Sequence, residues 1–391
     1  MDLAAIQSSL HDAGLDGWLF YDHHHRDPLA YRILGLDAEA HVTRRWFYLI
    51  PAHGEPRKLV HRIEASRLDS LPGTKSEYSS WQELEAELAR MLTGATTIAM
   101  QYSPRNAIMY VGLVDAGTIE VMLELGKIIT SSADLVSRFE AVLKNDQIAT
   151  HFEAQRRLDT ILAEGFDFIG NAARTGVGTD EFSMVTRLKE AIERAGMVTE
   201  HGPNVSVGLN SADSHYEPSL ASSRPIRSGD FLLIDIWAKL ANDPLAVWYD
   251  ITWTATIDRH ASDHEQLIFR TVRDARDAAV RTVQQAFQTG TPLAGWQPDE
   301  AARSVIRDAG FADAFTHRTG HNIATELHGA GAHLDNLETH DVRLILPKTC
   351  FSVEPGLYFP GQFGIRSEIN MITYYGDANV TGRIQNELLQ I

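Results

Sequence analysis

The chain has 391 residues, of which 44% are hydrophobic and 22% charged. A chain of this length and composition can bury cores in two or more domains, which excludes a disordered protein and a small disulfide-stapled one. The 35 Lys and Arg residues against 52 Asp and Glu give a formal net charge of −17. Binding to a nucleic-acid backbone draws on clustered cations, which are missing here, so no nucleic-acid partner is expected.

The cellular compartment is indicated by two features. Cys350 is the only cysteine, so we expect neither a disulfide within the chain nor a thiolate zinc cluster, and we expect Cys350 to pack in the core. The first residues lack the cationic start of a secretory signal, and no apolar run is long enough to span a membrane. We therefore expect a cytoplasmic protein without a membrane partner.

The first part of the chain alternates between helical and strand patterns, which is typical of a small α/β domain. The apolar spacing predicts a first helix, a buried strand, a hairpin around His53-Gly54-Glu55-Pro56, two helices, another strand and a further helix. These elements are expected at 3–10, 17–21, 46–50 with 58–60, 62–71 with 81–92, 97–102 and 132–143.

Beyond Lys144 the pattern changes to a long amphipathic stretch without intervening strands, so we place the domain boundary there, with domains at 1–144 and 145–391. The second domain is predicted to be α+β. Helices are expected at 148–173, 179–195, 262–288 and 298–308, and strands at 205–209, 231–239, 247–256, 351–358 and 365–373. Two of these strand pairs carry one acid on each strand, which indicates two similar hairpins that face each other.

Four acids interrupt the apolar strands of the second domain. Asp235 follows Phe231-Leu232-Leu233-Ile234, and Asp250, Glu354 and Glu368 occupy comparable positions. A buried carboxylate is costly unless a cation or strong donors accompany it, and Arg366 alone cannot neutralise four. Metal ions best supply the missing charge, with an imidazole from the stretch that contains His317, His321 and His328.

This ordered set resembles the creatinase and aminopeptidase P superfamily of metallopeptidases, peptidase family M24, with the pita-bread fold. Besides the five residues Asp235, Asp250, His321, Glu354 and Glu368, the resemblance rests on the His-x₃-His-x₆-His spacing, on Glu354-Pro355-Gly356 and on Gly364-Ile365-Arg366-Ser367-Glu368. It covers the whole chain, since the first part looks like the creatinase-type N-terminal domain of Xaa-Pro dipeptidases and aminopeptidases.

The resemblance implies two divalent metal ions per subunit, with Mn²⁺ expected and Zn²⁺ or Co²⁺ as alternatives. Asp235 would chelate one ion, Asp250 and Glu368 would bridge both, and His321 and Glu354 would complete the second. Glu354 would also move the proton of the attacking water, and His328 would stabilise the oxyanion. His215 matches the substrate-side histidine, and His317 and Arg366 match positions that orient ligands.

The sequence departs from the family pattern without losing a ligand. Ala324 replaces a usual glycine, Gly329 replaces a usual acid, and Ile369-Asn370 replaces an acidic continuation. The two aspartates are also farther apart than usual, with 240–244 as an enlarged hairpin tip. These changes concern the shape of the substrate pocket.

Plainer interpretations stand beside these. His215 and His328 could each be a satisfied structural histidine, and His317 and Arg366 could be structural as well. His23-His24-His25 reads as an exposed loop rather than a metal tract, and its alternative use is contact with substrate.

The predicted function is hydrolysis of Xaa-Pro bonds in small peptides by a homodimer, as a Xaa-Pro dipeptidase or else a Xaa-Pro aminopeptidase. A dipeptidase must cap the free proline carboxylate, by Arg366 or by a basic loop residue such as Arg26. A creatinase-like amidinohydrolase and a binding protein on the same fold are less favoured because relatives of those kinds lack the full ligand set.

Overall fold

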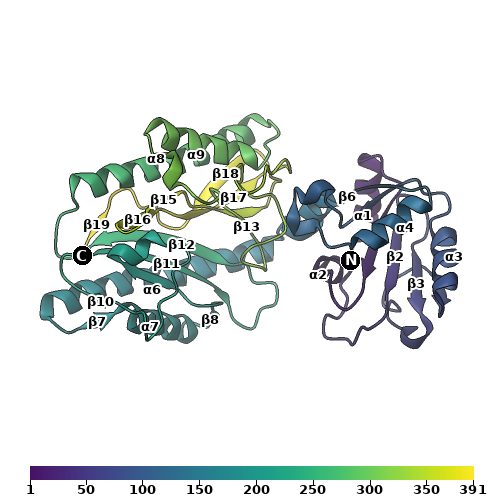
Figure 1. The fold of residues 1–391 in the computed structure, drawn as a ribbon, viewed down its shortest axis with the longest axis horizontal. Helices are drawn as coiled ribbons and strands as arrows, with labels where there is room; N and C mark the ends of the chain where they lie inside the picture. The colour runs from purple at the N-terminus through teal and green to yellow at the C-terminus, as the bar shows by residue number, and fades with distance from the viewer. The chain divides into compact units, whose positions relative to one another are not determined.

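The computed structural model describes residues 1–391, which divide into two compact units, Met1–Glu140 and Ala141–Ile391 (Figure 1). The sequence-based boundary at Lys144 lies just beyond Glu140. No helix of either unit combines the length and the apolar character that a membrane crossing requires. Each unit is described by itself below.

The first unit is a six-stranded mixed sheet with helices packed against it. The strand order is β4-β3-β2-β1-β5-β6, in which β1 pairs with β2 and β2 with β3 antiparallel, and the remaining pairs are parallel. Its elements are α1 (Leu3–Asp12), β1 (Gly17–Asp22), α2 (Pro28–Leu34), β2 (Trp46–Pro51), β3 (Arg57–His61), β4 (Thr74–Tyr78), α3 (Trp81–Met91), β5 (Thr97–Met100), α4 (Ala116–Glu124), β6 (Ile128–Ser131) and α5 (Ala133–Val136).

The helix predicted at 62–71 is wrong. Only one 3₁₀ turn, Arg62–Glu64, forms there. Separate tight turns follow it, in which the N–H groups of Arg67, Asp69 and Leu71 donate to the carbonyls three residues earlier. Two lysines of the neighbouring strands β3 and β4 also hold carbonyls of this loop. Lys58 Nζ donates to the carbonyls of Leu68 and Leu71, at 3.3 and 2.6 Å, and Lys75 Nζ donates to that of Ala65 at 3.1 Å. The apolar spacing in this segment reflects packing of a turn-rich loop rather than a helix.

The second unit places its strands between two pairs of helices (Figure 1). Its elements are α6 (Asn145–Thr175), β7 (Thr179–Asp180), α7 (Glu181–Arg194), β8 (Met197–Val198), β9 (Asn204–Val207), β10 (Pro225–Ile226), β11 (Phe231–Leu240), β12 (Tyr249–Thr256), α8 (Asp263–Thr289), α9 (Trp296–Asp308), β13 (Asn322–Ile323), β14 (Cys350–Val353), β15 (Gly356–Phe359), β16 (Phe363–Arg366), β17 (Ile369–Tyr374), β18 (Asp377–Thr381) and β19 (Leu389–Gln390).

Two sheets form the middle of this unit. One has the order β19-β12-β11-β8 with β9 also paired to β11, and the other has the order β13-β14-β17-β18. Helices α6 and α7 share a hydrophobic core with the first sheet through residues such as Leu158, Leu188 and Ile234. Helices α8 and α9 share another with the second sheet through Val272 and Phe351. The sheets meet where β12 lies beside β17.

The strand predicted at 351–358 is in fact two strands in different sheets. β14 ends at Val353 and pairs with β17, whereas β15 begins at Gly356 and pairs with β16. Pro355 separates them because it has no N–H to donate to a ladder. The predicted strand 365–373 divides in the same way between β16 and β17, so the second acid-bearing pair is β14 with β17 and not a simple hairpin.

Candidate metal centre

The two aspartates lie on adjacent antiparallel strands. In the β11–β12 pair, Asp235 stands opposite Thr252 and Asp250 opposite Trp237. Side chains alternate along a strand, and opposite residues share a face, so these four side chains lie on one face of the sheet. The register therefore sets the two carboxylates diagonally across a single strand pair.

The two glutamates enter the same region from the second sheet. Glu354 follows β14, and its backbone N–H donates to the carbonyl of Thr319 at 2.7 Å. Glu368 lies between β16 and β17, and its backbone N–H donates to the carbonyl of Thr252 at 3.2 Å. Since Thr252 belongs to β12, this bond joins the two acid-bearing sheets at the site.

His321 completes the group. Its Nε2 lies 3.4 Å from Oε1 of Glu354 and 3.7 Å from Oδ2 of Asp250. Ser352 holds the backbone of His321 twice, since Ser352 Oγ accepts from its N–H and its carbonyl accepts from the N–H of Ser352, each at 2.9 Å. The backbone of His321, which directly precedes the short strand β13, is thus held by β14.

The donor set fits a divalent metal ion. Potential ligand atoms of Asp250, His321 and Glu368 lie within 4.8 Å of one another, and all three residues are buried. Asp250 Oδ1 and Glu368 Oε1 are buried atoms without a hydrogen-bond partner. Buried polar atoms rarely lack a partner, and oxygen ligands with one imidazole suit divalent first-row ions.

The carboxylate pKa values support this fit. Burial, followed by the neighbouring carboxylates, raises the pKa of Asp250 and of Glu368 well above its ordinary value. Burial also raises the pKa of Asp235, although Arg366 opposes the shift. Glu354 differs. Burial acts to raise its pKa, but His321, Arg366, His317 and the Ser352 hydrogen bond together hold its pKa below the ordinary value. Without a cation, three of the four acids resist ionisation.

Asp235 is held at the edge of this group by two partners. Arg366 Nη2 makes an ion pair with Oδ2 of Asp235, and Thr252 Oγ1 lies 2.9 Å from Oδ1. Arg366 Nε donates to Thr252 Oγ1 at 2.9 Å and lies 3.9 Å from Oε2 of Glu354. The guanidinium of Arg366 is therefore directed at the carboxylate side of the site.

The remaining predicted histidines lie around the same cavity. The His328 and His321 rings meet edge to face with 4.3 Å between their centroids, and electrostatic repulsion from His321, followed by burial, lowers the His328 pKa to about 3. His317 Nε2 lies 2.9 Å from the hydroxyl of Tyr358, and burial lowers its pKa to about 4. His215 is exposed on the loop after the 3₁₀ helix Gly208–Ala212 and contacts none of the five predicted ligands through a hydrogen bond.

A cavity of about 640 Å³ opens onto this group. It is lined by four of the five predicted ligands, Asp235, Asp250, His321 and Glu354, and by His215, His317, His328 and Arg366. Glu368, which is 1% exposed, lies behind them. A small peptide fits a cavity of this size, which lies within the range of ligand sites.

The sequence analysis missed three residues that hold the site together. Thr252 bridges two carboxylates, Ser352 fixes His321, and the Tyr358 hydroxyl lies between His317 and Arg366 Nη1, at 2.9 and 3.4 Å. Of these three, only Thr252 could be linked to the site from the sequence, because it follows Asp250 by two positions on the same strand and its side chain therefore points to the same face. For a hydroxyl group in an apolar strand, the sequence does not show which charged group it contacts.

Two further sequence features can be placed within their own units. Cys350 is fully buried, its Sγ lies 3.9 Å from Nδ1 of His151, and burial raises the pKa of its thiol. His23, His24 and His25 follow β1 in the first unit, where His25 Nε2 lies 2.9 Å from the carbonyl of Ala40. The structure assigns Cys350 to packing, as expected.

Known proteins resemble this chain along its whole length. Metallopeptidase family M24 matches residues 151–373. A protein named probable dipeptidase PepE from Mycobacterium tuberculosis is 26% identical over 398 residues, which cover 100% of this chain and 96% of that protein. A Xaa-Pro dipeptidase of Lactobacillus helveticus is 29% identical over 205 residues, covering 52% of this chain and 50% of that one.

Solved structures show the same fold. The crystal structure of dipeptidase PepE from Mycobacterium ulcerans superposes with a TM-score of 0.72 at 24% identity, covering 100% of this chain and 96% of that one. The Xaa-Pro dipeptidase from Bacillus anthracis gives a TM-score of 0.65 at 20% identity, covering 100% and 99%.

Proposed function

Because this chain belongs to metallopeptidase family M24, we propose that it hydrolyses Xaa-Pro bonds in small peptides with two divalent metal ions, as a Xaa-Pro dipeptidase. Its fold is the expected α+β one, a creatinase-type N-terminal domain followed by a pita-bread domain. The observation that carries the proposal is the buried group of Asp250, His321 and Glu368, with its partnerless carboxylate oxygens.

The five predicted ligands would share the ions as follows. Asp250 and Glu368 would bridge both ions, Asp235 would hold one, and His321 with Glu354 would hold the other. When bound, the ions supply Lewis-acid polarisation of the scissile carbonyl and lower the pKa of the attacking water. Mn²⁺ is our first choice, because carboxylate oxygens dominate the donor set.

Glu354 is the residue we propose to move the proton. It is the one acid of the four whose pKa is lowered, so its carboxylate is ionised and can accept a proton. Oε1 already accepts from Ser352 Oγ at 2.9 Å, which leaves Oε2 to take the proton of the attacking water and pass it to the leaving nitrogen. His328, which is neutral because of its low pKa, would donate an N–H to the developing oxyanion.

Arg366 is proposed to orient Asp235 rather than to bind the proline carboxylate. Its Nη2 donates to Asp235, its Nε to Thr252, and its Nη1 to the carbonyl of Ser214 at 3.4 Å. With the Tyr358 hydroxyl, which lies 3.4 Å from Nη1, these bonds engage four of its five N–H groups. A cap from a basic loop residue such as Arg26 stays a prediction, as do the homodimer and the cytoplasmic location.

The proposal is tested with a matched pair of substrates. Chelator-treated protein is reloaded with Mn²⁺ and given Ala-Pro and Ala-Pro-Ala, and the products are separated by chromatography. We expect cleavage of Ala-Pro alone, which requires the metal. His321→Ala should abolish this cleavage, whereas His11→Ala, on an exposed helix of the first unit, should leave it intact.

Each outcome has a defined meaning. Cleavage of the tripeptide would replace the dipeptidase by a Xaa-Pro aminopeptidase, the second candidate, which relatives of that name support. Cleavage of neither peptide at any Mn²⁺ concentration would overturn the proposal.

A further inference from the structure

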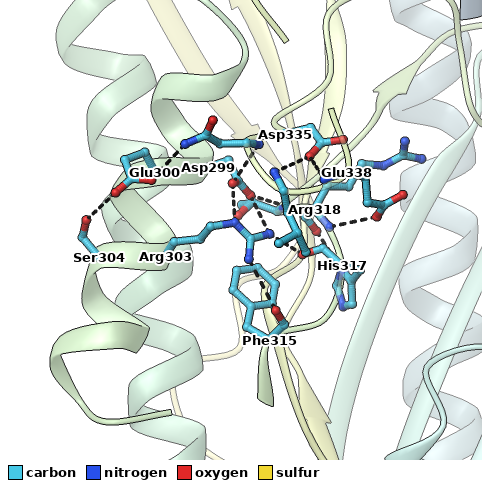
Figure 2. A network of polar contacts seen from close by, with 12 residues as sticks. Asp299, Glu300, Arg303, Ser304, Phe315, His317, Arg318, Asp335 and Glu338 are labelled. Atoms are coloured by element: carbon cyan, nitrogen blue, oxygen red, sulfur yellow. Dashed lines mark hydrogen bonds and ion pairs between the residues drawn. The ribbon is translucent and has the colours of Figure 1, made fainter. Parts of the chain in front are cut away.

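A polar network joins α9 to the segment that contains Phe315 and His317 and precedes His321 in the chain (Figure 2). Asp299 is fully buried and pairs with Arg303 one turn later, with Arg303 Nε 2.5 Å from Oδ2 of Asp299. Both carboxylate oxygens of Asp299 also accept from backbone N–H groups, Oδ1 from Thr319 at 2.7 Å and Oδ2 from Asn336 at 2.9 Å. One carboxylate thus joins a helix to two loops.

Arg303 holds the same segment from its other nitrogens. Its Nη2 donates to the carbonyl of His317 at 2.5 Å, and its Nη1 to that of Phe315 at 3.4 Å. The guanidinium carbon also lies 4.1 Å from the centroid of the Phe315 ring. Figure 2 shows Arg303 reaching from its helix toward Phe315 and His317. Backbone groups of residues 315, 317 and 319 are therefore held by one ion pair.

The other edge of this segment lies against β14. The carbonyl of Thr319 accepts from the N–H of Glu354 at 2.7 Å, and the backbone of His321 is bonded to Ser352. A Cβ on Gly320 would lie 2.0 Å from the carbonyl oxygen of Ser352, so the segment lies as close to β14 as backbone allows. Residues 317–321 are therefore hydrogen-bonded to Asp299 and Arg303 on one side and to β14 and Glu354 on the other.

The network also reaches the cavity wall. Glu338 Oε1 accepts from the N–H of Arg318 at 3.3 Å, and both residues line the cavity together with His317. Asn336 brings the loop of Glu338 onto Asp299. The ion pair therefore supports two loops of the cavity and the segment that ends in the proposed ligand His321.

We infer that Asp299 and Arg303 are positioning residues for the metal ligand His321, and that their ion pair sets the affinity of the site for its ions without contacting them. This inference rests on the proposed function. A guanidinium is required because its planar fork makes four hydrogen bonds here, two to the Asp299 carboxylate and one to each carbonyl, whereas an ammonium has only three N–H groups. Partners that orient a ligand typically change metal affinity 10- to 100-fold when removed.

The test uses Arg303→Lys, which keeps the charge beside Asp299 and loses the fork. Arg307→Lys is the matched control, since Arg307 is on the same helix and pairs with Glu300 at 3.1 Å, but its side chain is 53% exposed. Titration calorimetry of the chelator-treated proteins with Mn²⁺ gives the Kd. We expect the Kd to rise about 10-fold or more in Arg303→Lys and to stay unchanged in Arg307→Lys.

Two readouts separate positioning from a general loss of structure. In Arg303→Lys, activity lost at low Mn²⁺ should return at saturating Mn²⁺, whereas a damaged fold would not recover. Should the metal-free variant be marginally folded, the dependence of its Tm on Mn²⁺ concentration yields the Kd instead. Asp299→Asn, a second variant of nearly the same shape, should also weaken binding.

The outcomes distinguish the inference from the function on which it rests. If wild-type protein binds no Mn²⁺, the proposed function is overturned. If wild-type protein binds Mn²⁺ and Arg303→Lys and Asp299→Asn bind it equally well, the function stands and the positioning role is wrong.

Discussion

The hydroxyl oxygen of Thr252 lies 2.7 Å from Oε2 of Glu368. The same oxygen lies 2.9 Å from Oδ1 of Asp235 and accepts from Arg366 Nε. Because a hydroxyl has one hydrogen, Thr252 donates to one of the two carboxylates at a time. Thr252, a neutral residue, thus links Asp235 and Glu368, which are more than a hundred residues apart in the sequence.

Thr252→Val should destabilise the metal-free protein. Valine has nearly the same shape, so the change removes the hydroxyl and leaves a buried carboxylate without its donor, at a cost of about 1–3 kcal/mol. Urea unfolding in the presence of chelator measures this. Thr252→Ser, which keeps the hydroxyl, is the control, and equal stability of the valine variant and wild type would contradict the bridging role.

Asp250→Asn should stabilise the metal-free protein increasingly as the pH rises. Burial raises the folded-state pKa of Asp250 well above 3.8, so the unfolded chain loses its proton first and wild-type stability falls with rising pH. Asparagine does not titrate, and its advantage should grow from about pH 4 by at most about 1.4 kcal/mol per pH unit.

The comparison is made by urea unfolding of both proteins in chelator from pH 4 to 8. The remaining titrating groups are common to the two proteins, but Asp250 also raises the pKa of Glu368, so the difference reports the titration of the coupled acid group to which Asp250 belongs. With Mn²⁺ added, the wild type should become the more stable protein, because it alone keeps the full ligand set. An advantage of Asp250→Asn that does not change with pH would show that burial does not raise this pKa.

A similar argument applies to Asp27 in the first unit, which is 1% exposed. Its Oδ1 caps α2 by accepting from the N–H of Ala30 at 2.9 Å, while its Oδ2 has no partner. Burial raises its pKa to about 7, so wild-type stability should fall between about pH 4 and 7. Asp27→Asn keeps the cap and should gain stability over this window and then level off, as thermal unfolding at several pH values would show. A constant difference across the range would contradict it.

Glu181→Gln should weaken the loop that carries His215. Glu181 is fully buried, and its oxygens accept from the N–H groups of Val207 and Arg224, from the Asn210 amide and from the Tyr216 hydroxyl. In Glu181→Gln the amide NH₂ group would face groups that are themselves hydrogen-bond donors. We therefore expect the free energy of unfolding to fall by about 2–3 kcal/mol.

Tyr216 and His215 line the cavity, so the KM for Ala-Pro should rise as well. Glu190→Gln is the control, because Glu190 is on the same helix in an exposed pair with Arg194. If the two variants match in both stability and KM, Glu181 does not hold the loop.

Much of the second unit could be predicted because its elements are long. Helices α6 and α8, and strands β11 and β12, carry a sustained apolar pattern, and the structure confirms them with small differences at their ends. Strands such as β8 and β13 have two residues each, too few for any period to be visible. In the first unit, α2 and α4 were missed because they have only 7 and 9 residues, too few for a sustained apolar period, although an aspartate caps each of them.

The residues of the candidate site also differ in how well the sequence predicts them. Asp235 stands out because it interrupts an apolar strand, where a carboxylate needs a partner. Glu181 was not recognised from the sequence, because an acid at the start of a helix is explained by the helix dipole alone. Its oxygens in fact accept hydrogen bonds from Asn210 and Tyr216 in the loop that carries His215. Arg303 gave no sign at all, because an exposed helical arginine and a buried one look alike in sequence. The roles of His215 and His328 stay predictions.

The β11–β12 register runs unbroken from Phe231 opposite Thr256 to Ala238 opposite Tyr249. Both aspartates lie inside this paired region, and the enlarged tip that joins the strands lies outside it. The length of the tip beyond Leu240, which still pairs with Met197 of β8, can therefore change without moving either carboxylate, since loop extension costs little and leaves the β11–β12 ladder intact. A search pattern that counts residues between the aspartates would reject this chain, whereas one that follows strand pairing would retain it.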